Sequence, residues 1–188
     1  MRFLNLILNP MEKKISLLLA MILVLSGCNW IKDLAEVEFS TDLMLDIPVT
    51  VTGTKSADQA KALNASNFSA SLDLKLEDNE DIEPYLEKLR NIDLNSVMIT
   101  VNGLTSGQTI NTLTLEAAGV GIIFTQTNIS NENNSFTPEA DAAKLLQAGE
   151  KLKNDRKLTV TVSGTANSPM VFNVNLIFDA DITAGALD

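Results

Sequence analysis

Apolar and polar residues alternate along most of this chain with a period of two, and this pattern limits the folds that it can adopt. The clearest stretch runs from Phe68 to Glu77. Its apolar set is Phe68, Ala70, Leu72, Leu74 and Leu76, and its polar set is Ser69, Ser71, Asp73, Lys75 and Glu77. Successive side chains of a strand point to opposite faces, so each set lies on one face. Such a half-buried strand is typical of an antiparallel sheet.

The alternation recurs in several further stretches, separated by turns rich in Gly, Ser and Asn such as Asn102-Gly103. Their apolar positions are Val37, Phe39, Leu43, Leu45, Ile47, Val49, Val51, Val97, Ile99, Val101, Leu113, Leu115, Val120, Ile122, Phe124, Leu158, Val160, Val162, Phe172, Val174, Leu176, Phe178 and Ile182. We therefore expect an all-β domain over residues 36–188. It should be an antiparallel β-sandwich, immunoglobulin-like or related, of roughly seven to eight strands. A closed barrel is a minor alternative.

Two stretches follow a helical period instead, and we expect two short helices inserted between strands. The first has apolar residues at i, i+3, i+4 and i+7, with Asp81 as a capping residue. These positions are Ile82, Tyr85, Leu86 and Leu89. The second helix is expected from Pro138 to about Asn154, with Thr137 as N-cap and Pro138 as the first helical residue.

The N-terminal stretch from Met11 to Cys28 has the composition of an export signal. Lys13 and Lys14 precede an apolar run over residues 15–25. That run is shorter than the roughly 20 residues that a membrane-spanning helix needs, but it suits the apolar region of a signal peptide. Met11 is the more natural start of such a signal. An ordinary signal peptide with a stray cysteine, or a short membrane anchor, is the alternative.

The four residues Leu25-Ser26-Gly27-Cys28 resemble the lipobox of bacterial lipoproteins. The resemblance implies that the Cys28 thiol is acylated with fatty acids such as palmitate and that residues 1–27 are removed. Residues 28–35 would then form a lipidated tether in the cell envelope. In a Gram-negative bacterium, Asn29 in place of an aspartate after the cysteine would direct the protein to the outer membrane.

Charge and cysteine content exclude several classes of protein. Cys28 is the only cysteine, so the domain has no disulfide and no cysteine metal site. The whole chain has a formal net charge of −10 at pH 7, and the expected signal peptide contains more basic than acidic residues. The mature chain is therefore more acidic still. It should bind neither nucleic acid nor an anionic lipid surface.

The residues that most often perform catalysis are missing from the sequence. The chain contains no histidine, which excludes serine–histidine and cysteine–histidine catalysis and every histidine metal site. No glycine-rich phosphate loop is present. With one Trp and one Tyr, and most Phe residues on core positions, a sugar-stacking surface is disfavoured. We therefore expect a protein that is not an enzyme and needs no cofactor.

A dense acidic run is the main candidate for a site. Its residues are Glu77, Asp78, Glu80, Asp81 and Glu83. Carboxylate oxygens suit Ca²⁺, and Glu77, Asp78, Glu80 and Asp81 are weak calcium candidates because the spacing of known calcium loops is missing. A pair of these acids could also serve a glycosidase. A solvated turn is the favoured interpretation. The polar loop Asn131–Ser135 is a second, weaker ligand candidate.

These observations favour a lipid-anchored envelope protein with a non-catalytic structural, adhesive or assembly role. Its partners would be the membrane, through the lipid on Cys28, and an envelope protein of unknown identity. Two alternatives stay open. The domain could bind a small or lipidic ligand in a cavity between sheet and helix, or it could be a carboxylate-dependent hydrolase.

Overall fold

The predicted antiparallel β-sandwich is confirmed by a computed structural model, which describes residues 35–53 and 66–186. The expected signal peptide and Cys28 lie outside the described residues. The strands are β1 Glu36–Val51, β2 Ser66–Lys75, β3 Leu89–Asn102, β4 Thr109–Ala117, β5 Gly121–Ser130, β6 Ser135–Phe136, β7 Lys157–Ala166 and β8 Met170–Gly185. The helical elements are the 3₁₀-helices η1 Leu76–Asp78 and η2 Glu83–Lys88 and the α-helix α2 Ala142–Asp155.

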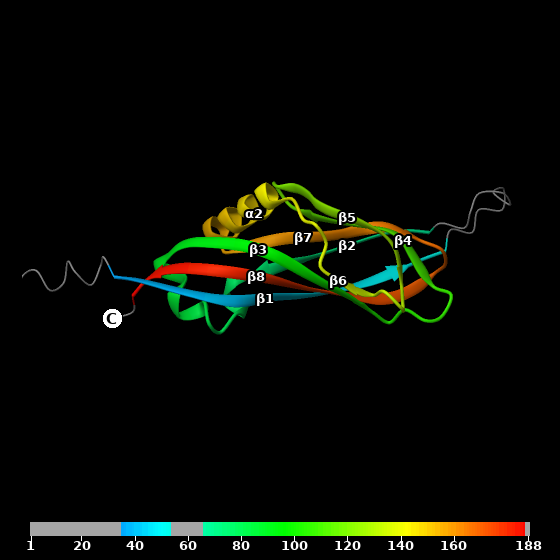
Figure 1. Cartoon of the computed structure of the whole chain (residues 1–188), viewed down its shortest axis with the longest axis horizontal. Coiled ribbons are helices and arrows are strands. Elements are labelled where there is room, and N and C mark those ends of the chain that lie inside the picture. Colours follow the sequence, from blue (N-terminus) through cyan, green and yellow to red (C-terminus); the bar gives the residue numbers. More distant parts are fainter. Residues whose placement is uncertain (1–34, 54–65, 187–188) are drawn as a thin grey trace, which may run out of the picture.

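The strands form two four-stranded sheets that lie face to face along the long axis of the molecule (Figure 1). Sheet A has the order β1-β8-β3-β6, and sheet B has the order β2-β7-β4-β5. All the paired strands are antiparallel. This is the strand order of an eight-stranded jelly roll and differs from the order in an immunoglobulin sandwich. Among the strands that the structure describes, only β4 and β5 are consecutive and pair with each other, so neighbouring strands mostly come from distant parts of the chain.

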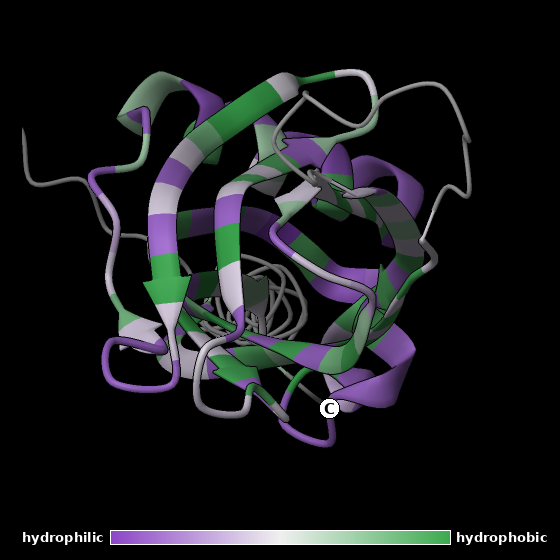
Figure 2. Ribbon diagram, turned by 90° about the vertical axis from the view of Figure 1, so that its right-hand side faces the viewer, coloured by the Kyte–Doolittle hydropathy of each residue, from purple (hydrophilic) through white to green (hydrophobic). Residues whose placement is uncertain are grey.

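The alternating side chains build the core between the two sheets. Viewed from one end, hydrophobic and hydrophilic bands alternate along the strands (Figure 2). Phe172 of β8 and Phe68 of β2 meet across the core edge to face, with ring centroids 5.3 Å apart. Ser66 is the one buried polar residue among those that the structure describes. Every buried side-chain nitrogen or oxygen of these residues has a hydrogen-bond partner, as stable interiors require.

The edge of sheet A at β3 is covered by two elements. The short β6 pairs with β3 at Ile99 and Thr100, and α2 packs against β3 and β7. At Gly149 the helix approaches so closely that an added Cβ would lie 2.2 Å from the carbonyl oxygen of Ile92. A bare glycine is what allows this approach. Covering an edge in this way hides hydrogen-bonding groups that would otherwise pair with another chain.

The first predicted helix is wrong in type. Residues 83–88 form the 3₁₀-helix η2, and β3 begins directly afterwards at Leu89. Six residues are too few for a stable α-helix. In a 3₁₀-helix residues i and i+3 align, so Ile82 and Tyr85 keep the predicted apolar side. Asp81 does not cap this helix; its carboxylate instead accepts a hydrogen bond from Thr41.

The second predicted helix exists, but it begins later than the sequence suggested. α2 starts at Ala142, and Asp141 is its N-cap, accepting hydrogen bonds from the backbone N–H groups of residues 143 and 144. Thr137 and Pro138 lie in the irregular segment before it. The Asp141 N–H donates to the carbonyl oxygen of Ile123, 3.2 Å away, which holds the chain on β5 until the helix begins. Aspartate caps as well as threonine, so composition alone could not separate them.

Two residues that alternation placed in the core are exposed. Ile122 is 57% exposed, whereas Ile123 and Phe124 are buried. The cause is a register shift after Leu115, where β5 has one residue more than β4. The extra residue reverses which side chains of β5 face the core from that point on. Leu72 of β2, the terminal strand of sheet B, is 43% exposed, although Phe68 and Leu74 on the same face of that strand are buried.

Candidate binding surface

The acidic turn after β2 is fixed against β1 by one asparagine. The side-chain oxygen of Asn79 accepts hydrogen bonds from the backbone N–H groups of Asp81 and Ile82, at 3.0 and 3.1 Å. Its nitrogen donates to the carbonyl oxygen of Asp42 at 3.1 Å. Leu76 and Ile82, on either side of the tip, are fully buried. The turn is therefore firmly packed against the sandwich, whereas the carboxylates that it carries are exposed.

The structure does not gather the calcium candidates into a site. Glu77 forms an ion pair with Lys75 at 3.4 Å, and Asp81 accepts a hydrogen bond from Thr41 at 2.8 Å. Asp78 and Glu80 lie on the exposed tip between them. Within residues 35–53 and 66–186, no three acidic residues or cysteines come close enough together to hold a metal ion. Calcium takes six to eight oxygen ligands, and the carboxylates of this turn do not come together around one point where an ion could bind.

The polar loop Asn131–Ser135 uses its asparagines for its own structure. The Asn133 side chain accepts a hydrogen bond from the N–H of Ser130 at 2.6 Å and donates to the carbonyl oxygen of Asn128 at 2.9 Å. The Asn134 side chain donates to the carbonyl oxygen of Val101 at 3.0 Å. These contacts fasten the loop to β5 and β3. The loop is thus a connector in which the amides of Asn133 and Asn134 already have partners.

The outer face of sheet A carries an exposed apolar row that alternation had not singled out. Met44 of β1 lies opposite Ile177 of β8, and Ile177 lies opposite Met98 of β3. Met44 is 63% exposed and Met98 is 42% exposed, while Ile177 is half-buried between them. We call these three residues the methionine row. Each occupies the solvent-facing parity of its strand, where the neighbouring positions are polar.

Acidic residues border the methionine row on one side. In the adjacent row Asp42 of β1 lies directly opposite Asp179 of β8. In the row after that, Asp181 of β8 lies directly opposite Asp93 of β3. We call these four residues the aspartate pairs. Like charges directly opposite each other on neighbouring strands destabilise a sheet, so the arrangement has an energetic cost.

Neutral donors stabilise two of these carboxylates, and the first is Asp93, which accepts a hydrogen bond from the Asn91 amide at 2.7 Å. The Ser40 hydroxyl donates to Asp181 at 2.6 Å and the Asn95 amide donates to it at 2.9 Å. These hydrogen bonds lower the pKa of Asp181 below its ordinary value because they favour the charged form. Asp181 therefore stays ionised at neutral pH, and neither of its donors adds positive charge to the face.

A groove continues this surface onto the acidic turn. It is open, has a volume of about 700 Å³, and lies between β1 and the turn. Its lining includes Asp42, Met44 and Asp179 from sheet A and Asp78, Glu80 and Asp81 from the turn. Among the described residues, Lys75 is the one cation in the lining, and its ammonium group pairs with Glu77. Apolar and negatively charged groups therefore meet in one accessible depression.

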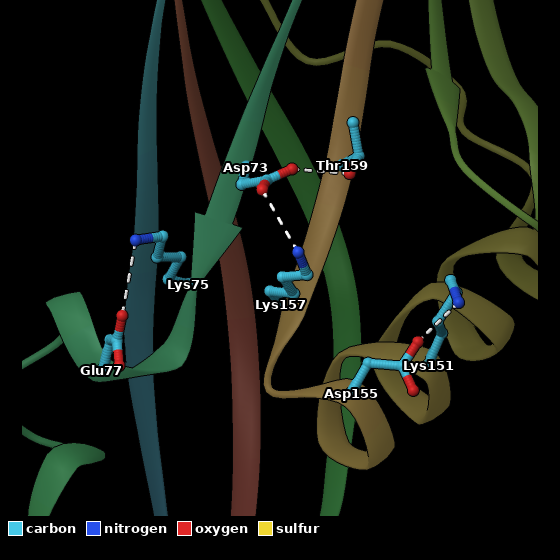
Figure 3. A network of polar contacts seen from close by, with 7 residues as sticks. All are labelled: Asp73, Lys75, Glu77, Lys151, Asp155, Lys157 and Thr159. Atoms are coloured by element: carbon cyan, nitrogen blue, oxygen red, sulfur yellow. Dashed lines mark hydrogen bonds and ion pairs between the residues drawn. The ribbon is translucent and has the colours of Figure 1, made fainter.

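Among the described residues, further ion pairs lie on sheet B and on α2 (Figure 3), and Arg90 of β3 pairs with Glu36 at the start of β1 in sheet A. Asp73 accepts a hydrogen bond from Thr159 at 2.6 Å and pairs with Lys157 at 3.6 Å. These contacts, the Thr159 hydrogen bond first, lower the pKa of Asp73. On α2, Lys151 pairs with Asp155 at 2.6 Å. The acids there are neutralised by neighbouring cations, in contrast to the aspartate pairs.

Two observations bear on the two alternative functions. A ligand cavity between α2 and the sheets would need space, but Leu145, Ala148 and Leu152 are buried there and Gly149 leaves no room for a methyl group. An acid catalyst needs a raised carboxyl pKa. Among the carboxyls of the described residues, those with clearly shifted pKa values are Asp73, Glu87 and Asp181, and all three values are lowered.

Comparisons with known proteins add little to this description. The chain matches no protein-family model and no curated protein. Among solved structures it is similar to a chain of Desmodium yellow mottle tymovirus, with 11% identity, 81% of this chain and 91% of that chain covered, and a TM-score of 0.34. A chain of turnip yellow mosaic virus has 10% identity, covers 81% and 97%, and has a TM-score of 0.29. TM-scores this low carry no argument about this protein.

Proposed function

We propose that this protein is a lipoprotein of the bacterial cell envelope that is anchored through Cys28 and binds a partner through the outer face of sheet A. The observation that carries the binding role is the methionine row beside the aspartate pairs. Exposed apolar side chains grouped in one place, next to uncompensated charge, are typical of a surface that a partner covers. The anchoring is supported by the signal peptide and the lipobox. No helix among the described residues is long and apolar enough to cross a membrane.

The tether would hold the domain close to the bilayer. β1 begins at Glu36, so residues 28–35 separate the acylated cysteine from the first strand. A fully extended residue spans at most about 3.3–3.6 Å, which limits the tether to roughly 30 Å. The partner would therefore be another component of the same envelope, in the outer membrane or near it if the source is Gram-negative. The role would be assembly or adhesion without chemistry.

The anchor is tested by changing Cys28 to alanine. The natural chain should incorporate a labelled palmitate analogue in growing cells, and the Cys28→Ala chain should incorporate none, because the thiol that accepts the lipid is gone. Ser26→Ala is the matched control. It keeps a small residue beside the cleavage site and should leave labelling intact. Labelled Cys28→Ala protein, or a natural chain without label, would show that the lipoprotein interpretation is wrong.

The binding role is tested by site-specific photo-crosslinking in intact cells. A photoreactive amino acid at Met98, within the methionine row, should give a discrete higher-mass adduct. The same amino acid at Leu146, which is 54% exposed on α2, should give none. Both positions are exposed, so replacement should not disturb the fold. Equal crosslinking at the two positions, or none at Met98 and none at Met44, would contradict a binding role for this face.

A further inference from the structure

We infer that the outer face of sheet A binds an extended segment of a partner protein in which basic side chains alternate with apolar ones. This inference rests on the proposed binding role and adds the chemistry of the partner. It follows from the shape of the methionine row, from the charge beside it and from the repulsion that this charge imposes on a second copy of the chain.

The methionine row offers a narrow apolar strip. Neighbouring strands of a sheet lie about 4.7–4.9 Å apart, so three strands place Met44, Ile177 and Met98 across roughly 10 Å. Along the strands the strip is only one row deep, because the outward-facing positions two residues before and after each member are polar, so it fits one or two apolar side chains. Methionine is flexible and polarisable, which lets it adapt to several side chains. An extended segment, whose alternate side chains point the same way, matches this geometry.

The aspartate pairs select the charge of the segment. Asp42 faces Asp179 and Asp93 faces Asp181 across adjacent strands, in the two rows beside the methionine row. Lysine or arginine side chains lying over these rows would replace repulsion with attraction. A second copy of this chain would bring aspartates against aspartates if it presented the same face. A cationic partner is therefore favoured over self-association.

The acidic turn extends the binding surface beyond the sheet. Asp78, Glu80 and Asp81 line the groove together with Asp42 and Asp179. A segment that crosses the aspartate pairs toward β1 therefore meets further carboxylates along the groove. The negative charge is spread over both walls. This distribution suits several basic side chains in succession better than a single metal ion, because the carboxylates do not come together around one point.

The inference is tested with three labelled peptides and the purified mature lipoprotein in nanodiscs of zwitterionic phosphatidylcholine. The peptides alternate lysine with valine, lysine with serine, or glutamate with valine, and binding is measured by fluorescence anisotropy against empty nanodiscs. The lysine–valine peptide should bind. The lysine–serine peptide should bind about tenfold more weakly, because it buries no apolar side chain. The glutamate–valine peptide should not bind, and added salt should weaken the lysine–valine complex.

Variants of the protein separate the two parts of the surface. Met44→Ser combined with Met98→Ser should reduce affinity for the lysine–valine peptide about tenfold, while Leu146→Ser on α2 should leave it unchanged. Asp42→Asn combined with Asp179→Asn should also weaken binding, with Glu150→Gln as its control. This asparagine variant should melt at the same temperature as the natural chain or higher, because it removes a repulsive pair. If these aspartates affected only the stability of the fold, weaker peptide binding would not be accompanied by an unchanged or higher melting temperature.

Specific results would overturn the inference. Equal affinity for the lysine–valine and lysine–serine peptides would show that the methionine row does not contribute to binding. If either double variant bound the peptide as the natural chain does and had a normal melting curve, the residues changed in that variant would not be part of the binding surface. No binding of any peptide would reject the partner chemistry as a whole. The proposed function fails separately, through the palmitate labelling and the crosslinking in cells, which do not depend on these peptides.

Discussion

Replacing Phe172 with alanine is expected to lower the free energy of unfolding by about 3–5 kcal/mol. Phe172 is 2% exposed and lies on β8, a central strand of sheet A. Its ring meets Phe68 of the opposite sheet at 88°. Truncation removes the buried apolar area, breaks the aromatic pair and leaves a cavity that strands on both sides keep open.

The effect can be measured by urea denaturation of the purified mature protein, monitored by circular dichroism. Val171→Ala is the control, because Val171 is the neighbouring residue in β8 and is 66% exposed. Its replacement should change the free energy of unfolding by less than about 0.5 kcal/mol. A similar loss for both variants would show that the core does not lie on the Phe172 side of the strand.

Replacing Gly164 with alanine is expected to lower the free energy of unfolding by about 3 kcal/mol, at the upper end of the usual cost of overpacking. A Cβ at Gly164 in β7 would lie 1.9 Å from the carbonyl oxygen of Thr112 in β4 and 2.9 Å from the ring of Phe68. The ring could turn aside. The carbonyl oxygen belongs to the backbone of β4, next to a register shift, so the two strands would have to separate.

Gly185→Ala is the matched control for this substitution. Gly185 is also in a strand, yet the nearest atom to an added Cβ there is 3.5 Å away, on the Lys88 side chain. That distance is an ordinary contact, so the urea midpoint should stay nearly unchanged. If Gly164→Ala had no greater effect than Gly185→Ala, the close contact between β7 and β4 described here would be wrong.

The strands of this fold could be predicted from the sequence because each buries one face against a single core. Alternation correctly located the segments around Phe68, Val97, Leu158 and Phe172. The pairing of the strands could not be predicted, since nearly every neighbour in a jelly roll is distant along the chain. Asp42 meets Asp179 because the β1–β8 register fixes it, and no local pattern contains that information.

Alternation marks the three members of the methionine row one by one, but it does not bring them together. Met44, Met98 and Ile177 are apolar residues on the polar parity of their strands. Each residue alone is unremarkable, because isolated exposed apolar side chains are common. Only the register of three strands brings them into one row. The acidic run, by contrast, was visible from composition, but composition could not show that its carboxylates fail to converge.

The two ends of the sandwich differ in how they can be engineered. Glu36 at the start of β1 pairs with Gly185 at the end of β8, and the N–H of Ala186 donates to the carbonyl oxygen of Ala35 at 3.1 Å. If Cys28 carries the proposed lipid, a reporter protein fused after Ala186 would begin beside the bilayer and compete with it for space. The loop between β3 and β4, around Ser106, lies at the opposite end of these strands. An epitope tag inserted there would extend away from the lipid and leave the anchored end undisturbed.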